Sequence, residues 1–209
     1  MIDSKYFFKG FKSIKGVGSP AIALGASFIA IGALLNNLGF SIQESIFSTF
    51  LTYALPGSLV MAESMLIGAS LVNIFIAVWL VNARLYPMTV SLMPLLMHED
   101  QPRWKYYLSC HFIAVSSWLI MKDNYEDIEK ENRIDFWIGI GTATWSVAIF
   151  STVIGYIASD FLNKDILIGL AIINPIYFIC MMLGAMKTIQ ISLSVILGAV
   201  LGPAFYFLS

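Results

Sequence analysis

The sequence predicts an all-α, polytopic membrane protein with about seven transmembrane segments, some of them formed by broken helices. Of its 209 residues, 58% are hydrophobic and only 12% are charged, whereas about a quarter of the residues of a soluble domain are charged. The long apolar runs are close to the roughly 20 residues that cross the hydrocarbon core as a helix. They do not alternate polar and apolar residues, which excludes a transmembrane β-barrel.

The whole chain, 1–209, is expected to form a single transmembrane domain. Its N-terminal segment 1–16 is basic, and we expect this segment to lie at the membrane interface. As a helix it has lysines on one face and apolar side chains on another. The alternative is a frayed basic tail. Lysines in front of the first span predict a cytoplasmic N-terminus in the inner (plasma) membrane. The lysines are Lys5, Lys9 and Lys12, and the apolar residues are Phe7, Phe11 and Ile14.

The first span is expected at 20–38, where Pro20 opens an apolar run. Ser41 follows as a helix N-cap, with Glu44 three residues later, which predicts a capping box. The helix that it opens, 45–62, should be broken near Pro56-Gly57.

Residues 65–97 are too long for one straight span, because 33 residues of helix measure roughly 50 Å. The stretch from Asn82 to Pro87 interrupts them, so we predict two segments, 65–81 and 87–97. If both cross the membrane, Arg103 and Lys105 share the cytoplasmic side with the N-terminal lysines. If the run crosses once, they lie outside. The positive-inside rule favours two crossings.

Further spans are expected at 106–121, 136–158, 166–186 and 189–208. Cys110 and Cys180 lie in apolar runs without pairing or metal-ligand spacing, so neither a disulfide, a metal nor a cofactor is expected. No catalytic motif is present, so we do not expect an enzyme. The net charge of −1 gives no sign of a nucleic-acid partner. A ridge of small residues on the last span predicts close contact with another helix: Ser194, Gly198 and Gly202.

Arg84 is the main candidate for a functional side chain. An ionisable group inside a span costs roughly 2.5–3.5 kcal/mol on insertion scales, so its presence suggests a role, and a guanidinium can hold a carboxylate with two hydrogen bonds. Transporters place substrates where helices are broken near mid-membrane, and Pro56-Gly57 and Asn174-Pro175 are further breaks. The predicted substrate-binding residues are Arg84, Asn82, Gly57 and Asn174. The alternative for Arg84 is an interfacial helix cap.

Three segments carry a family resemblance: Val81-Asn82-Ala83-Arg84-Leu85 followed by Ser91-Leu92-Met93-Pro94, the small-residue run 48–70 around Gly57, and Phe136-Trp137-Ile138-Gly139-Ile140-Gly141 with Trp145 one turn on. In this order and spacing they resemble the AzlC family of bacterial membrane proteins, the large subunits of branched-chain amino-acid exporters.

The resemblance implies a permease subunit that exports small apolar amino acids by alternating access, together with a small AzlD-like membrane protein. The sequence departs from the family pattern where that pattern has polar or titratable residues, at Val60, Leu85, Val115 and Ser116. A non-transporting scaffold or assembly subunit is therefore the alternative, and an intramembrane enzyme a more distant one.

Overall fold

The computed structural model describes residues 2–15 and 20–161, and beyond them only residues 163, 165, 166, 168, 169, 172, 176, 179, 192, 193, 196–198 and 201. Among the described residues, every regular element is a helix, as predicted. The α-helices are α1 (Ser4–Lys12), α2 (Pro20–Asn37), α3 (Ile42–Thr52), α4 (Leu55–Leu66), α5 (Leu71–Asn82), α6 (Leu85–Leu96), α7 (Arg103–Ser109), α8 (Val115–Asn124) and α9 (Arg133–Ala158). Three 3-10 turns accompany them: η1 (Cys110–Phe112), η2 (Tyr125–Asp127) and η3 (Lys130–Asn132).

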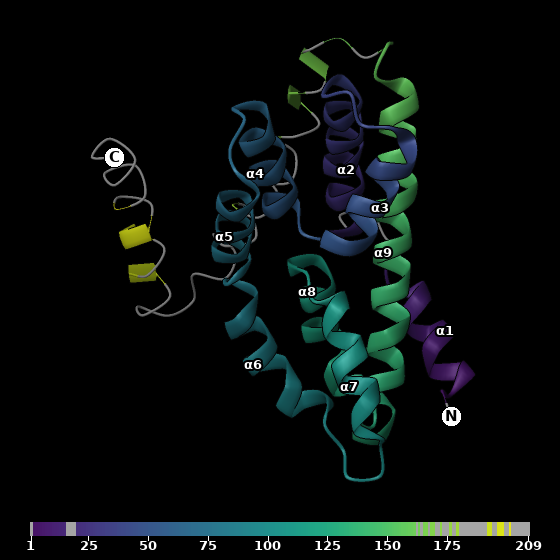
Figure 1. The fold of residues 1–209 in the computed structure, drawn as a ribbon. Coiled ribbons are helices and arrows are strands. Elements are labelled where there is room, and N and C mark those ends of the chain that lie inside the picture. The colour runs from purple at the N-terminus through teal and green to yellow at the C-terminus, as the bar shows by residue number, and fades with distance from the viewer. Residues whose placement is uncertain are drawn as a thin grey trace.

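Helix α9 is the axis of the described fold. Its 26 residues measure roughly 39 Å, enough to cross a bilayer. α1 lies beside the half of α9 that begins at Arg133, and α2 lies beside the half that ends at Ala158 (Figure 1). These two ends are called the Arg133 end and the Ala158 end below. α2 and α9 are both long and apolar enough to span a membrane, in agreement with the predicted spans 20–38 and 136–158.

α2 and α9 pack backbone to backbone because each carries a glycine at the contact. Gly32 lies against the carbonyl of Thr152, and Gly155 lies against the carbonyl of Ile29, so closely that a Cβ on either glycine would overlap the opposite backbone. Small residues allow this approach in membranes, where packing holds helices together. The two helices therefore form one close-packed pair.

α3 and α4 form a hairpin that enters from the Ala158 end and turns back. α3 begins where the Tyr156 hydroxyl donates to the carbonyl of Phe40 (2.8 Å), and it ends where the Trp145 indole donates to the carbonyl of Phe50 (3.3 Å). Its 11 residues and the 12 of α4 are each roughly 17 Å long, about half of the hydrocarbon core.

The predicted single span 45–62 is therefore wrong, whereas the break predicted near Pro56-Gly57 is present and lies slightly earlier in the chain. The break lies at Tyr53–Ala54, where Tyr53 adopts a left-handed conformation with φ 34° and Ala54 is extended. Pro56 belongs to the first turn of α4, where a missing N–H breaks no helical hydrogen bond. The predicted capping box of Ser41 and Glu44 does open α3.

α7, η1 and α8 form a second hairpin, which enters from the opposite end. α7 begins at the Arg133 end, η1 brings Phe112 against Gly141 near the middle of α9, and α8 returns toward the loop that precedes α9. The predicted span 106–121 is thus wrong as well. Its break lies at Ile113–Ala114, where both residues are extended.

α5 and α6 follow one another with a bend of 46° between them, and together they run from the Ala158 end to the Arg133 end (Figure 1). The two separate crossings favoured for 65–81 and 87–97 are not confirmed, because a pair bent in this way corresponds either to one broken span or to a re-entrant loop. Arg103 and Lys105 nevertheless lie on the side of the N-terminus, because the α3–α4 hairpin does not cross.

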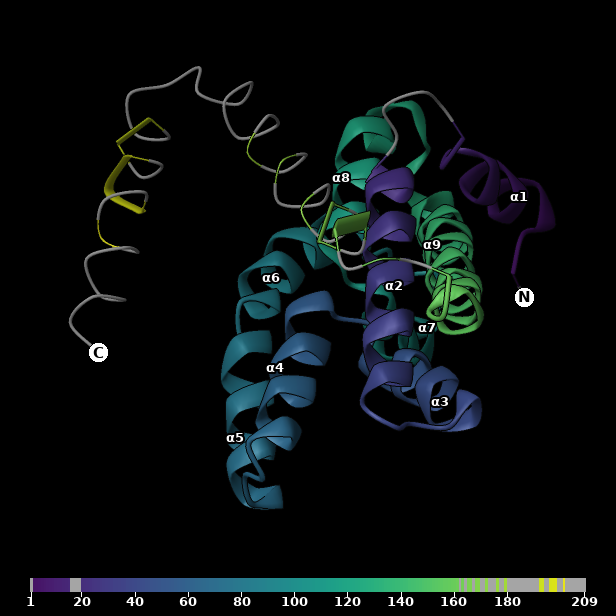
Figure 2. The ribbon, with the colours of Figure 1, turned by 90° about the horizontal axis from the view of Figure 1, so that it is seen from above.

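The elements α2–α5 and α6–α9 are arranged as inverted counterparts, each with one hairpin, and the two hairpins point in opposite directions (Figures 1 and 2). In the described residues, α2, α9 and the bent pair α5–α6 give up to three crossings. The predicted count of about seven is not confirmed. Most residues of the predicted segments 166–186 and 189–208, Asn174, Ser194 and Gly202 among them, lie outside the described residues.

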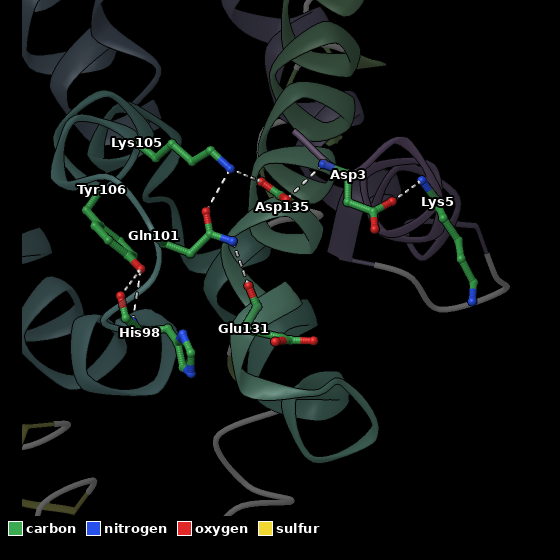
Figure 3. A network of polar contacts seen from close by, with 8 residues as sticks. All are labelled: Asp3, Lys5, His98, Gln101, Lys105, Tyr106, Glu131 and Asp135. Atoms are coloured by element: carbon green, nitrogen blue, oxygen red, sulfur yellow. Dashed lines mark hydrogen bonds and ion pairs between the residues drawn. The ribbon is translucent and has the colours of Figure 1, made fainter. Parts of the chain in front are cut away.

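A buried ion pair ties three helices together at the Arg133 end (Figure 3). Lys105 of α7 lies 2.8 Å from Asp135 of α9, and both side chains are at most 2% exposed. Lys105 also donates to Gln101, and the backbone N–H of Asp3, the N-cap of α1, donates to Asp135 at 2.9 Å. Lys105 therefore belongs to α7 and is buried inside the protein.

The N-terminal segment forms a helix, as its lysine pattern predicts, and it docks on α9 rather than fraying. Gly10 and Gly139 face each other at this contact, and a Cβ on either would overlap the backbone of the other helix. Lys5, Lys9 and Lys12 remain exposed.

Candidate functional site: a central cavity at three helix breaks

The three interruptions of the helices meet at one small cavity of about 40 Å³. α2 contributes Leu24, and the remaining lining residues flank the breaks between α3 and α4, between α5 and α6, and before α8. They are Tyr53, Ala54, Leu55, Arg84, Leu85, Ala114, Val115 and Ser116. Segments distant in sequence thus converge on one point between the two hairpins.

At each hairpin break, backbone N–H groups and backbone carbonyls both lie next to the cavity. The N-cap residues of α4 and α8 are Ala54 and Ala114, and neither has a side chain that can cap the first turn. A helix start leaves N–H groups without partners and carries roughly half a positive charge, while a helix end leaves carbonyls and the opposite charge. In each hairpin, a helix end and a helix start adjoin at the break.

Arg84 is the one charged residue among the described residues that line the cavity, and overall it is an exposed residue. It is the N-cap residue of α6 and forms no hydrogen bond or ion pair with any described residue. None of the described lining residues is an aspartate or a glutamate. The cavity can therefore accept an anionic group, and the free carbonyls at the helix ends can accept hydrogen bonds from a cationic one.

Two more of the predicted site residues lie one turn from the cavity lining. The Asn82 side chain packs directly on Gly57, where a methyl group would lie 2.6 Å from Asn82 Nδ2. Asn82 Oδ1 and the neighbouring Ser58 Oγ are buried without a hydrogen-bond partner among the described atoms. The structure thus brings Arg84, Asn82 and Gly57 into one region, while Asn174 lies outside the described residues.

A family model described as AzlC protein matches residues 20–162, which is more than half of the chain. The chain belongs to the AzlC family. The match includes both hairpins, all three breaks and the central cavity. The family is associated with branched-chain amino-acid transport. The apolar helices of this chain are compatible with a membrane protein. No curated protein and no solved structure matches the chain.

Sequence reasoning missed the part of the site that α8 contributes in this AzlC-family chain. The break at Ile113–Ala114 contains no proline or glycine, so no local sequence signal marks it. One indirect signal was available: Leu85, Val115 and Ser116, three of the four departures from the AzlC pattern, all line the central cavity.

Proposed function

We propose that this AzlC-family chain is the permease subunit of an exporter of small apolar, branched-chain-type amino acids. The observation that carries the proposal is the meeting of three helix breaks and Arg84 at one cavity. Broken helices supply unpaired backbone groups to a ligand without burying additional charged side chains.

Both charged groups of a zwitterionic amino acid find complementary groups around the central cavity. Its carboxylate can accept hydrogen bonds from the Arg84 guanidinium and from the first-turn N–H groups of α4 and α8. Its ammonium group can donate to the free carbonyls at the end of α3. Its apolar side chain fits a lining that is mostly aliphatic: Leu24, Leu55, Leu85, Ala114 and Val115.

The size of the cavity supports a mechanism in which the hairpins move. A volume of about 40 Å³ accommodates a water molecule or two and is too small for an amino acid. The two hairpins enter from opposite ends, so a displacement of one opens the cavity toward one side only. Alternating access follows if they move in turn.

For orientation, we propose that the Arg133 end is cytoplasmic in the inner (plasma) membrane. The described basic residues other than Arg84 gather toward this end, and the positive-inside rule assigns such an end to the cytoplasm. They are Lys5, Lys9, Lys12, Lys15, Arg103, Lys105, Lys122, Lys130 and Arg133.

We further propose a small AzlD-like membrane protein as the partner, which the family resemblance implies. The exposed apolar face of α5 gives such a subunit room to bind, with Leu71, Phe75 and Trp79 all at least 63% exposed. Lipid can cover the same face, so co-purification with the neighbouring small membrane protein is the test of the partner.

Counterflow in proteoliposomes tests the proposed function. The chain is reconstituted with and without the small partner, and the exchange of labelled leucine is measured. Leucine exchange that requires Arg84, and that is kept when Arg103 is replaced by alanine, supports the permease. A folded wild-type complex that exchanges no aliphatic amino acid would support the scaffold alternative instead.

A further inference from the structure

A second and much larger cavity, of about 1220 Å³, lies between α6 and α7 at the Arg133 end. Ligand pockets commonly have roughly 300–1000 Å³, so this cavity can admit an amino acid together with water. It is separate from the central cavity, since no residue lines both.

The lining of this larger cavity contains charged residues of both signs. They come from the loop after α6, from the start of α7 and from the loop before α9, and they are Glu99, Asp100, Arg103 and Lys130, accompanied by His98. Charged side chains are costly in hydrocarbon, so lipid tails do not suit this space. Water and polar solutes do.

The two cavities are close neighbours along two separate elements. On α6, Thr89 lines the large cavity and Leu85 lines the central one, and the Thr89 hydroxyl donates to the Leu85 carbonyl at 2.9 Å. Four residues of helix rise roughly 6 Å. On the α7–α8 hairpin, Cys110 lines the large cavity and Ala114 the central one.

The layer between the cavities is apolar. Leu85, Cys110 and Phe112 all pack on one buried core cluster, which also includes Leu92 and Trp137. A thin apolar layer between a large polar space and a small central site is the arrangement expected of a closed barrier.

We propose that the large cavity is a water-filled vestibule that leads from the cytoplasm to the central cavity, and that the layer around Leu85 and Phe112 is the inner barrier. The identity of the solute that passes rests on the proposed function. The presence of water in the vestibule does not, so the two ideas can fail separately.

Cysteine accessibility tests the vestibule without any transport measurement. Cys110 and Cys180 are the two cysteines of the chain. One variant, Cys180→Ser, keeps only Cys110. In a background with both cysteines changed to serine, Thr89→Cys reports from the vestibule wall. Val90→Cys is the matched control, since Val90 neighbours Thr89, is 54% exposed and does not line the cavity.

A charged, membrane-impermeant thiol reagent is applied to inside-out and right-side-out vesicles. We expect Cys110 and Thr89→Cys to react in inside-out vesicles at least about tenfold faster than Val90→Cys, because a thiol must ionise in water to react. In right-side-out vesicles they should not react. Lack of reaction from the inside, or equal reaction from both sides, would overturn the vestibule.

A second measurement separates the vestibule from its solute. Leucine added to inside-out vesicles should slow the reaction at Thr89→Cys if the solute is an aliphatic amino acid. Unchanged rates with leucine, in variants that still react from the inside only, would contradict the amino-acid solute and leave the vestibule standing.

Discussion

Arg84, the N-cap residue of α6, and Lys105, within α7, are both cations, and they differ in their interaction partners. Lys105 has its counter-charge inside the protein, in Asp135 at 2.8 Å. Arg84 lines the central cavity and has no hydrogen-bond or ion-pair partner among the described residues. A buried cation that is paired with an anion of the same protein is compatible with a stable fold only while that ion pair is intact. One that lacks such a partner is available to a ligand.

Replacing Arg84 should affect transport and not folding. Arg84→Ala should abolish leucine exchange, and Arg84→Lys should raise the half-saturating leucine concentration roughly tenfold or more, because a lysine keeps the charge and loses the two-pronged geometry. The measurement is counterflow in proteoliposomes, with thermal unfolding in detergent as the control. If Arg84→Ala unfolds the protein, Arg84 is a structural residue.

Replacing one partner of the buried ion pair should instead destabilise the fold. Asp135→Asn leaves Lys105 buried without its counter-charge, which typically costs about 3–5 kcal/mol. The double variant Lys105→Met, Asp135→Leu should recover much of that loss, since two apolar residues need no pairing. Thermal unfolding of the wild type, of Asp135→Asn and of the double variant is the measurement. An Asp135→Asn variant as stable as the wild type would contradict a structural role of the Lys105–Asp135 pair.

At the scale of the elements, the hairpins explain why short helices suffice in this membrane protein. α3, α4 and α8 have 11, 12 and 10 residues and are too short to span the core. Their inner ends do not face lipid, because they meet at the central cavity among protein atoms. Unpaired backbone groups are tolerated at membrane depth in such surroundings.

A carboxylate placed permanently at the start of α8 should compete with the substrate. Ser116 lines the central cavity and is 2% exposed. Ser116→Asp should therefore abolish leucine exchange in a folded protein, since Arg84 and the α8 N-terminus can pair with the new charge. Ser116→Ala is the matched control and should retain exchange. Normal exchange by Ser116→Asp would show that no substrate carboxylate binds there.

The contact between α2 and α9 should depend on its glycines. Gly155→Ala would place a methyl group into the backbone of Ile29, which should destabilise the protein by about 1–3 kcal/mol or more. Gly198→Ala is the comparison, since no atom of a described residue lies within 4 Å of a Cβ there. Equal unfolding temperatures for the two variants would contradict the close α2–α9 packing.

At the scale of the whole molecule, the inverted arrangement of α2–α5 and α6–α9 determines which loops share a side of the membrane. α2 leads the chain along the Ala158 half of α9 to the Ala158 end, and α5 and α6 lead it back toward the Arg133 end (Figure 1). The hairpins return to the side from which they enter. Residues near Ser4 and near Asp100 therefore share one side, and the α4–α5 turn lies on the other.

Single cysteines in a cysteine-free background test this topology. We expect Ser4→Cys and Asp100→Cys to react with an impermeant reagent only when cells are opened, and Ile67→Cys, which is 83% exposed in the α4–α5 turn, to react in intact cells. Reaction of Asp100→Cys and Ile67→Cys from the same side would mean that α5 and α6 do not form one crossing.

The sequence by itself determined the all-α membrane class, the helices at 20–38 and 136–158 and the Ser41–Glu44 cap. It also predicted Arg84, Asn82 and Gly57 as site residues, and the structure brings these three into one region. These conclusions rest on composition, run length and local backbone chemistry, all of which act over a few neighbouring residues. The same reasoning found the break at Asn82–Pro87, because an arginine and a proline mark it.

Only the tertiary structure decided that 42–66 and 103–124 are hairpins and not spans. An apolar run has the same composition whether it crosses the membrane or turns back halfway, and Ile113–Ala114 carries no turn residue. What makes the turn stable is its surroundings: Ala114 packs with Leu24, Phe28 and Tyr53, which come from elements far away in the sequence. The same holds for the pairing of Lys105 with Asp135, which lie 30 residues apart.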